Sequence, residues 1–168
     1  MFPVSTIATI NDMTSTRPLD DPRLTAVGLL IEVHQGLTAK FSPRLSDHGL
    51  SENEFEILLR LCRTPGGRLR MSDLAAQTSL TTSGVTRVVD RLERAGKVTR
   101  ETCDTDRRGT WARITEKGLG KVSETVADHV VDIERWYTGQ LTAEQLEGLT
   151  SALRIVRDAV RPDAVAGL

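Results

Sequence analysis

Apolar residues recur at steps of three and four along most of the chain, which predicts a mainly α-helical protein. The first stripe begins at Leu24 and comprises Val27, Leu30, Ile31, His34, Leu37, Thr38 and Phe41. Pro43 and Gly49 follow it, and we expect both in a loop. A second helix opens at Ser51, where Glu54 completes a capping box, and the sequence TPGG at 64–67 ends it.

The middle of the chain predicts a helix-turn-helix. The sequence SDLAAQT forms a short helix that begins at Ser72, and TTSGVTRVVDRLERAG forms a longer helix from about Thr81 to Ala95, with Gly96 as its C-terminal stop. The longer helix has an apolar stripe of Val85, Val88, Val89 and Leu92. Two helices joined by so short a turn are typical of this motif.

The spacing of apolar residues then changes from a helical pattern to one typical of β-strands. RLRM, at 68–71, is a short extended segment, and KVTRETC and TWARI are β-prone. The sequence DTDRRG, at 104–109, joins these two as a hairpin loop. Because a helix-turn-helix followed at once by a two-stranded wing is a winged helix, we predict a mainly α fold with a small β-wing.

Two further helices complete the chain. Thr115 caps a long helix that runs to about Tyr137, and Thr142 with Gln145 forms a second capping box. The last helix carries a narrow apolar seam, at steps of three and four, of Leu146, Leu149, Leu153, Val156 and Val160. Such a seam is typical of a coiled-coil interface, and two heptads cannot stand alone, so we expect an oligomer.

The chain therefore divides into four parts. Residues 1–19 are rich in Ser, Thr, Pro and Asn without a period, and we expect a flexible arm. Residues 20–48 form an N-terminal dimerisation helix and loop, 49–114 the winged helix-turn-helix, and 115–168 the C-terminal dimerisation helices.

Charge is distributed unevenly behind a formal net charge of −1. Between Arg60 and Lys117 there are 13 Lys and Arg against 7 Asp and Glu, whereas the rest of the chain holds 9 against 16. A basic middle between acidic ends indicates an anionic partner for the middle, although ordinary segregation of surface charge is the alternative.

The longer helix of the motif has a polar face suited to DNA. Opposite its apolar stripe it presents Thr82, Ser83, Thr86, Arg87, Asp90 and Arg91. Short hydroxyl side chains let the backbone approach the major groove, and arginine can read guanine through two hydrogen bonds. A solvated amphipathic helix is the alternative, but the hairpin that follows favours DNA. We predict that Thr82, Ser83, Thr86, Arg87 and Arg91 contact DNA.

The hairpin loop supplies the second predicted contact. Arg107 and Arg108 at its tip can reach DNA beside the helix, because a narrow minor groove attracts an inserted arginine. Asp106 lies two residues before Arg108, so in an extended backbone the two side chains point the same way. We predict that Asp106 supports the wing by holding Arg108 in one rotamer, and that Gly109 lets the tip turn.

Residues 71–118 resemble the MarR-type winged-helix repressors, most specifically in DRLERAG, DTDRRG and ITEKG. The flanking helices match in order and length, so the likeness covers roughly residues 20–160. It implies a homodimer clasped by the terminal helices, a pseudo-palindromic double-stranded operator, and repression relieved by a small ligand or by oxidation. The recognition role falls on Ser83, Thr86 and Arg87, and the wing roles on Asp106 and Arg108. Trp111 departs from the pattern, which usually has a smaller residue.

Two residue pairs suggest how such a regulator could be switched. His34 lies on an apolar stripe, where it is either a hydrogen-bonded core histidine or a polar group in an effector crevice between the dimer helices and the winged domain. Trp111 could form the floor of that crevice. Cys103 adjoins the wing, and its oxidation could move the wing off DNA, whereas Cys62 on an apolar stripe is expected to be inert.

Other classes of protein receive less support. There is no i, i+4 histidine pair, and we expect His48 and His129 at a surface or interface, so no metal and no cofactor is predicted. We find no nucleophile–base pair and no phosphate-binding glycine loop, which argues against an enzyme. Two distant cysteines and the lack of an apolar stretch of about 18 residues predict a cytoplasmic protein with no membrane partner.

The sequence therefore predicts a dimeric, sequence-specific transcriptional regulator, acting as a repressor that a small-molecule effector releases. Two alternatives stay open. One is a redox-responsive regulator acting through Cys103. The other is an interaction module in which the winged domain binds a protein and the basic face is incidental.

Overall fold

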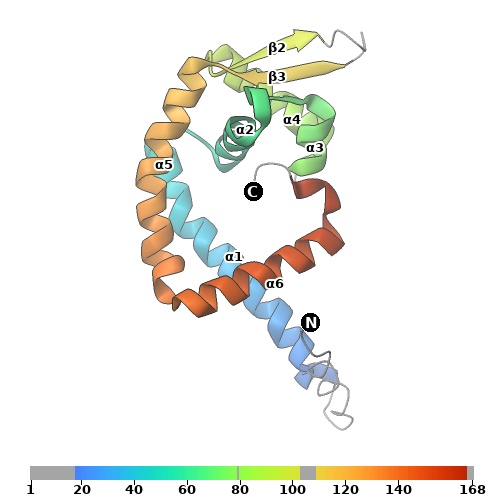
Figure 1. Ribbon diagram of the computed structural model, residues 1–168, viewed down its shortest axis with the longest axis vertical. Helices are drawn as coiled ribbons and strands as arrows, with labels where there is room; N and C mark the ends of the chain where they lie inside the picture. The colour runs from blue at the N-terminus through green and yellow to red at the C-terminus, as the bar shows by residue number, and fades with distance from the viewer. Residues whose placement is uncertain (1–17, 79, 103–108, 166–168) are drawn as a thin grey trace. The chain divides into compact units, whose positions relative to one another are not determined.

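The computed structural model describes residues 18–78, 80–102 and 109–165. The predicted arm at 1–19 therefore lies outside the described residues except for its last two positions, as do Cys103, Asp106, Arg107 and Arg108. The chain forms two compact units, Met1–Thr38 and Ala39–Leu168. The second unit holds the winged helix and both C-terminal helices (Figure 1).

The order of elements confirms the predicted fold class. The α-helices are α1 (Pro22–Asp47), α2 (Glu52–Arg63), α3 (Met71–Gln77), α4 (Thr82–Arg94), α5 (Glu116–Trp136) and α6 (Ala143–Val160). The strands are β1 (Arg68–Arg70), β2 (Val98–Thr102) and β3 (Thr110–Ile114), and short 3-10 turns lie at Pro18–Asp20, Pro65–Gly67, Thr138–Gln140 and Pro162–Val165.

Local capping signals fix the helix ends much as the sequence predicts. Ser51 with Glu54 and Thr142 with Gln145 both form complete capping boxes. At the end of α4, Gly96 has a φ of +70°, and the next amide, that of Lys97, donates to the carbonyl of Leu92. This is the glycine-terminated arrangement that satisfies the last carbonyls of a helix.

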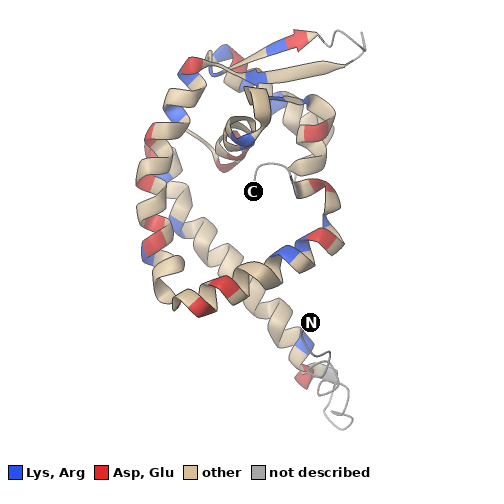
Figure 2. Ribbon diagram, viewed as in Figure 1, with Lys and Arg blue, Asp and Glu red and all other residues tan. Residues whose placement is uncertain are grey.

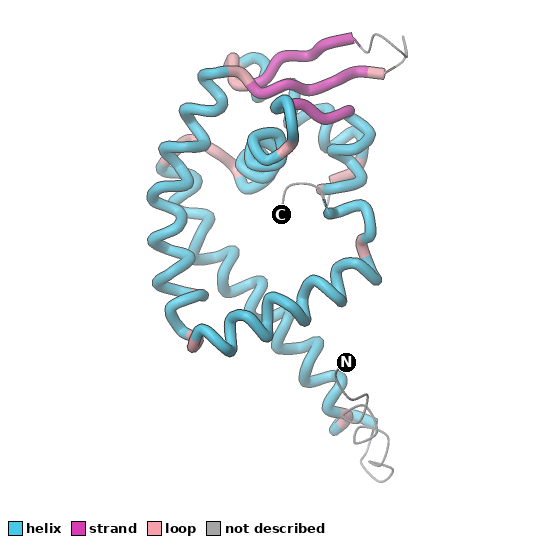
Figure 3. Tube along the Cα trace, viewed as in Figure 1, coloured by secondary structure: helices cyan, strands magenta, loops and turns pink. Residues whose placement is uncertain are grey.

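The three strands form one antiparallel sheet in the order β1–β3–β2 (Figure 3). Arg70 lies opposite Trp111 on one side of β3, and Arg100 lies opposite Ala112 on the other. The sequence predicts the β2–β3 hairpin, but the pairing of β1 with β3 depends on contacts between distant residues. β1 closes the sheet on the side next to α3.

One apolar core holds the winged helix together. It joins buried residues of α2, α3, α4 and the sheet, of which the most completely buried are Ile57, Leu58, Leu61, Leu74, Val85, Val89, Leu92 and Val98. The predicted stripe of α4 is part of this core. The C-terminal end of the chain returns to α3, where Arg161 Nη2 donates to the carbonyl of Thr78 over 2.6 Å.

The structure corrects the expectation for Pro43. We expected this residue in a loop, but it lies inside α1, which continues to Asp47. A proline removes one amide hydrogen-bond donor from a helix, but contacts of the residues that follow Pro43 hold this turn in place. Leu45 is only 4% exposed, and Arg44 Nε donates to Asp132 Oδ2 of α5 over 2.8 Å.

The two histidines expected at a surface or interface are both partly buried. His129 of α5 lies edge-on to the rings of Phe41 and Phe55, at centroid distances of 4.8 and 5.2 Å. Its Nδ1 atom is buried and has no hydrogen-bond partner among the described residues. Burial lowers the pKa of His129, although Asp132 opposes this effect. His48 is paired with Asp128 through Nε2 over 3.0 Å.

The two helices expected to form the dimer expose their apolar residues in the single chain. No residue of α6 is buried, and Leu149 and Leu153 of the predicted seam are each 37% exposed. Leu24, Val27 and Leu30 of α1 are exposed as well. His34 is also exposed, so the interpretation as a core histidine is wrong for this chain by itself.

Candidate nucleic-acid interface

The N-terminal half of α4 presents a polar, exposed surface. Thr81 caps the helix by accepting a hydrogen bond from the amide of Gly84 at 3.1 Å. Beyond the cap, the exposed positions form two rows at four-residue spacing, namely Thr82 with Thr86 and Ser83 with Arg87. The valines and the leucine of the opposite face are buried in the core, which fixes the direction in which these rows point.

Arg87 and Arg91 are one turn apart but have different surroundings. Within the described residues, Arg87 is exposed and makes no ion pair. Arg91 is 47% exposed, and its Nε atom donates to Glu54 Oε1 of α2 over 3.1 Å. Burial raises the pKa of Glu54, but hydrogen bonds from Ser51 and Arg91 outweigh this and lower it overall. Arg91, predicted as a DNA contact, therefore links α4 to the capping box of α2.

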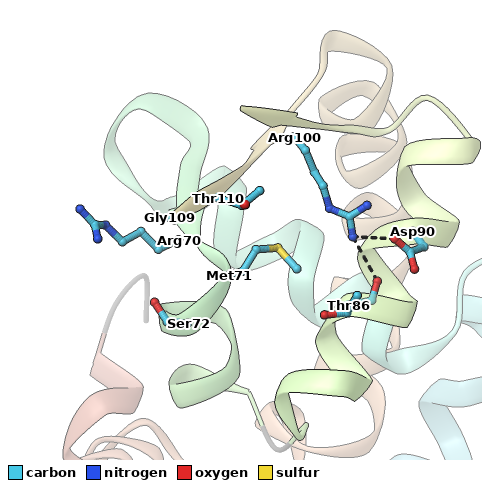
Figure 4. A pocket seen from close by; sticks show the side chains of 8 residues that line it. All are labelled: Arg70, Met71, Ser72, Thr86, Asp90, Arg100, Gly109 and Thr110. Carbon is cyan, nitrogen blue, oxygen red and sulfur yellow. Dashed lines mark hydrogen bonds and ion pairs between the residues drawn. The ribbon is translucent and has the colours of Figure 1, made fainter. Parts of the chain in front are cut away.

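Arg100 of β2 binds α4 through several groups and was missed by the sequence reasoning. Its Nη2 atom lies 2.6 Å from Asp90 Oδ1 and donates to the carbonyl of Thr86 over 3.3 Å (Figure 4). Its Nη1 atom and its amide donate to the carboxylate of Glu93, over 2.7 and 3.1 Å. The Arg100 side chain, 26% exposed, joins β2 to α4. The acidic pair on the helix followed by an arginine in the next strand is the signal that could have revealed it.

A cavity of about 490 Å³ lies beside this arginine, between α3, α4 and the wing strands. Its lining combines hydroxyl, carboxylate and guanidinium groups with one methionine, and the residues are Arg70, Met71, Ser72, Thr86, Asp90, Arg100, Gly109 and Thr110 (Figure 4). Its size is in the range of small-molecule sites.

Trp111 lies on the opposite face of the sheet from Arg100. The guanidinium carbons of Arg68 and Arg70 are 4.9 and 5.3 Å from the centre of its ring. The residue between the two arginines, Leu69, is buried, as is Ala112 next to Trp111. The structure therefore gives Trp111 two arginine neighbours on the outer face of the sheet, and its predicted place on the floor of an effector crevice stays a prediction.

The predicted wing tip falls outside the described residues. Strands β2 and β3 are paired as far as Thr102 and Thr110, so residues 103–109 connect them. The roles predicted for Cys103, Asp106, Arg107 and Arg108 stay predictions. Burial raises the pKa of the Cys62 thiol, which agrees with the expectation that this cysteine is unreactive.

The described residues support neither a metal site nor a membrane-spanning helix. Nowhere in 18–78, 80–102 and 109–165 do three or more His, Cys, Asp or Glu side chains gather as they would around a metal ion. None of the helices in this part of the chain has the length and apolar character needed to cross a membrane.

Comparison with known proteins identifies the family. Residues 48–109 match the model of the MarR family. The HTH-type transcriptional regulator MhqR of Bacillus subtilis is 30% identical over 128 residues, which cover 76% of this chain and 86% of MhqR. A match of this length is longer than the winged helix, so the likeness extends into the flanking helices.

Solved structures agree with this assignment. AbsC of Streptomyces coelicolor, a MarR family transcriptional regulator, is 36% identical with a TM-score of 0.79, over 88% of this chain and 99% of AbsC. Sco3205 of the same organism, solved in complex with DNA, is 29% identical with a TM-score of 0.77, over 94% and 98% of the two chains. The relatives are regulators, which confirms the prediction that the chain is not an enzyme. The chain belongs to the MarR family of transcriptional regulators.

Proposed function

We propose that the chain forms a homodimer that binds a pseudo-palindromic double-stranded operator and represses transcription until a small molecule releases it. The observation that carries this proposal is the exposed polar row at the start of α4, in which Ser83 and Arg87 point away from a core fixed by Val85 and Val89. A helix N-terminus favours phosphate, and an exposed arginine can pair with guanine.

In this proposal α4 reads the major groove and the wing reaches the neighbouring minor groove. Thr82, Ser83 and Thr86 let the helix backbone lie close to the DNA, and Arg87 supplies direct reading of a base. Arg107 and Arg108 act from the wing, with Asp106 as the support of Arg108. The Nε atom of Arg91 is bound to Glu54, so this residue contacts DNA through the rest of its guanidinium.

Dimerisation follows from the exposed apolar residues of α1 and α6. A two-fold dimer presents two copies of α4, and two copies require an operator with two related half-sites. The exposed seam of α6 includes Leu149, Leu153, Val156 and Val160, which a monomer would leave in contact with water. Burial of such a seam stabilises a dimer by on the order of 25 cal/mol per Å² of apolar area.

The cavity beside Arg100 supports release by a small molecule. Its walls include Asp90 and Arg100, whose ion pair joins the wing to α4. A ligand that binds there with a preference for one arrangement of these groups changes the position of the wing relative to the helix. Because a dimer bound to an operator excludes other proteins from that DNA, loss of binding restores transcription.

The test begins with operator selection from random duplexes, followed by affinity measurements over a salt series. We expect a linear fall of log K with log salt, because phosphate contacts release counterions. Arg87→Ala should weaken binding to the best site by roughly 1–3 kcal/mol and relax its sequence preference. Arg108→Ala should weaken binding in a way that depends on the A·T content of the flank.

The control is Lys121→Ala, which removes one positive charge from α5 and should leave affinity nearly unchanged. Wild-type affinity in both arginine variants at moderate salt would show that these residues do not contact DNA. Binding without salt dependence would instead favour the alternative, a winged domain that binds a protein.

A further inference from the structure

After α6 the chain returns to the first helix of the helix-turn-helix. Helix α6 ends at Val160 because Pro162 follows Arg161, and the residue before a proline is disfavoured in helical geometry. Arg161 accordingly has a φ of −147° and a ψ of 67°. The 3-10 turn Pro162–Val165 then contacts α3 (Figure 1).

Arg161 binds the end of α3 through two backbone carbonyls. Its Nη2 atom donates to the carbonyl of Thr78 over 2.6 Å and to that of Ala76 over 3.2 Å, so it joins residues 83 positions apart. The last carbonyls of an α-helix have no partner within the helix and carry its negative partial charge, which attracts a cation. The guanidinium therefore supplies donors at the place where a helix end needs them.

The turn that follows Arg161 is packed as well as hydrogen-bonded. Ala164 is 5% exposed, whereas no residue of α6 is buried. The amide of Ala164 donates to the carbonyl of Arg161 over 3.0 Å, which closes the turn. A buried residue directly after a helix that has none indicates that this turn is docked onto its neighbour.

The distribution of charge along α6 suits this attachment. Figure 2 shows acidic positions in its first turns and basic positions toward the end that approaches α3. The acidic residues are Glu144 and Glu147, and Arg154 and Arg157 follow in the second half. Arg157 Nη2 is paired with Asp158 over 2.7 Å, so this arginine has a local partner, whereas Arg161 reaches α3.

The other end of the helix-turn-helix is attached through α5. Thr115, which caps α5, donates through Oγ1 to the carbonyl of Gly96 just after α4, over 2.8 Å. Further along α5, the ring of His129 lies 5.2 Å from that of Phe55 of α2. The helix-turn-helix is thus joined to the C-terminal helices at both ends, by α5 where α4 ends and by Arg161 where α3 ends.

We propose that Arg161 and the turn Pro162–Val165, here called the C-terminal latch, fix the angle of the winged helix relative to α5 and α6 and so determine the spacing of operator half-sites that the dimer accepts. This inference rests on the proposed function and extends it. A domain joined on one side only can turn about that joint, and a second attachment on the other side opposes the rotation.

The two-fold symmetry of the proposed dimer extends the effect to both half-sites. The same latch acts on both copies of α4, whose separation and direction have to match those of the half-sites. Arg161 is in this sense a positioning residue, which acts through the place of α4 and makes no contact with DNA.

The experiment uses the full-length protein and duplexes in which base pairs are inserted or removed between the half-sites of the selected operator. One base pair turns a half-site by roughly 34° and moves it by about 3.4 Å. We expect wild type to lose about tenfold in affinity for each such step, comparable to the loss of a base contact. In Arg161→Ala the loss per step should fall to about threefold, because the hydrogen bonds that oppose rotation are gone.

Two further variants test the latch by other routes. Ala164→Glu places a charge at a buried position and should detach the turn with Arg161 intact, so it should show the same weak dependence on spacing. Arg161→Lys keeps a positive donor for the carbonyls and should restore most of the wild-type preference. If Arg161→Ala does not fold, Arg161→Met retains the apolar stem of the side chain and replaces it.

The same segment offers two matched controls. Arg157→Ala removes an arginine one turn earlier on α6, and Asp163→Ala changes an exposed residue of the latch turn itself. Both should keep the wild-type dependence on spacing. Light scattering shows whether each variant is a dimer, and thermal unfolding shows whether it is folded.

Three outcomes would overturn the C-terminal latch while the proposed function stands. The first is an unchanged dependence on spacing in folded, dimeric Arg161→Ala and Ala164→Glu. The second is an equal loss of affinity at every spacing, which would give Arg161 a contact with DNA or a role in stability alone. The third is a wild type that binds all spacings equally well. If wild type bound none of the duplexes, the proposed function itself would fail.

Discussion

The guanidinium of Arg100 is bound to the carboxylate of Asp90, with 2.6 Å between Nη2 and Oδ1. This ion pair joins the first strand of the wing to the middle of α4, and Glu93 strengthens it from the next turn of the helix. The two elements proposed to contact DNA are thus held at a fixed separation. Holding them together saves the entropy that would otherwise be lost when both engage one operator.

The first prediction concerns this link. Arg100→Gln should weaken operator binding several-fold, because the wing then has to be ordered upon binding. In that background Arg108→Ala should cost less than in wild type, since a loose wing contributes less, and such coupling is measured by a double-mutant cycle. The melting temperature should change little, because the ion pair is partly exposed.

Asp90→Asn distinguishes two roles of Asp90. The residue either holds Arg100 in position or only repels DNA through its negative charge. If Asp90 were only an acid near DNA, removal of its charge would tighten binding at low salt. If it holds Arg100, binding should stay equal or weaken despite the more positive surface. Tighter binding at every salt concentration would contradict the positioning role.

A second prediction concerns the start of α5, where Gly118 lies against the backbone of Lys97. A Cβ atom added at Gly118 would approach the Lys97 carbonyl oxygen to 2.2 Å, so Gly118→Ala must displace the backbone. We expect a loss of about 1–3 kcal/mol in the free energy of unfolding, as in other overpacked sites. Gly120→Ala, two residues along the same helix, meets nothing within 4 Å and should be neutral or stabilising by up to about 1 kcal/mol. Urea unfolding measures the free energy of unfolding of both variants. Equal stability of the two would refute the close contact between Gly118 and Lys97 as a cause of destabilisation.

The third prediction concerns assembly. Leu153 lies in the centre of the exposed seam of α6, so Leu153→Asp should convert the dimer to a monomer or prevent folding. Ser151→Asp places the same charge on the opposite side of the helix and should leave the dimer intact. Light scattering measures the oligomeric state, and circular dichroism shows whether each variant is folded. A folded dimer of Leu153→Asp would exclude this seam as the interface.

The fourth prediction is a pH dependence of stability. In the unfolded chain a histidine titrates near about pH 6.5, whereas burial between Phe41 and Phe55 lowers the pKa of His129. The unfolded state therefore takes up the proton first as the pH falls. The free energy of unfolding should be at its full value above about pH 6.5 and should decrease as the pH drops from there toward the folded pKa.

His129→Phe removes the titrating group and should flatten this part of the stability curve. His34→Gln, a change at an exposed histidine, should keep the decrease seen in wild type. Urea unfolding at about pH 7.5 and 5.5 measures the difference. If the free energy of unfolding of His129→Phe decreased between these pH values as much as that of wild type, groups other than His129 would cause the decrease.

The sequence by itself determined the elements and the side of α4 that faces the core. Ser51, Thr81, Thr115 and Thr142 cap helices where their short side chains predict it, because a cap depends on atoms only two or three residues away. The stripe of α4 is buried as its spacing predicts, because helical periodicity also depends on neighbours in sequence. These signals, together with the hairpin predicted from two β-prone segments, were sufficient to predict the fold class.

Only the tertiary structure decided how individual charges are used. Arg87 and Arg91 have the same place in the pattern, one turn apart, yet within the described part of the chain only Arg91 meets a carboxylate of another helix. Trp111 has two arginine neighbours because β1 pairs with β3, and the turn of α1 that contains Pro43 is joined to α5 by the pair of Arg44 with Asp132, 88 residues away. The physical reason is common to all three: these energies depend on contacts between residues distant in sequence, and spacing along the chain does not determine which groups folding brings together.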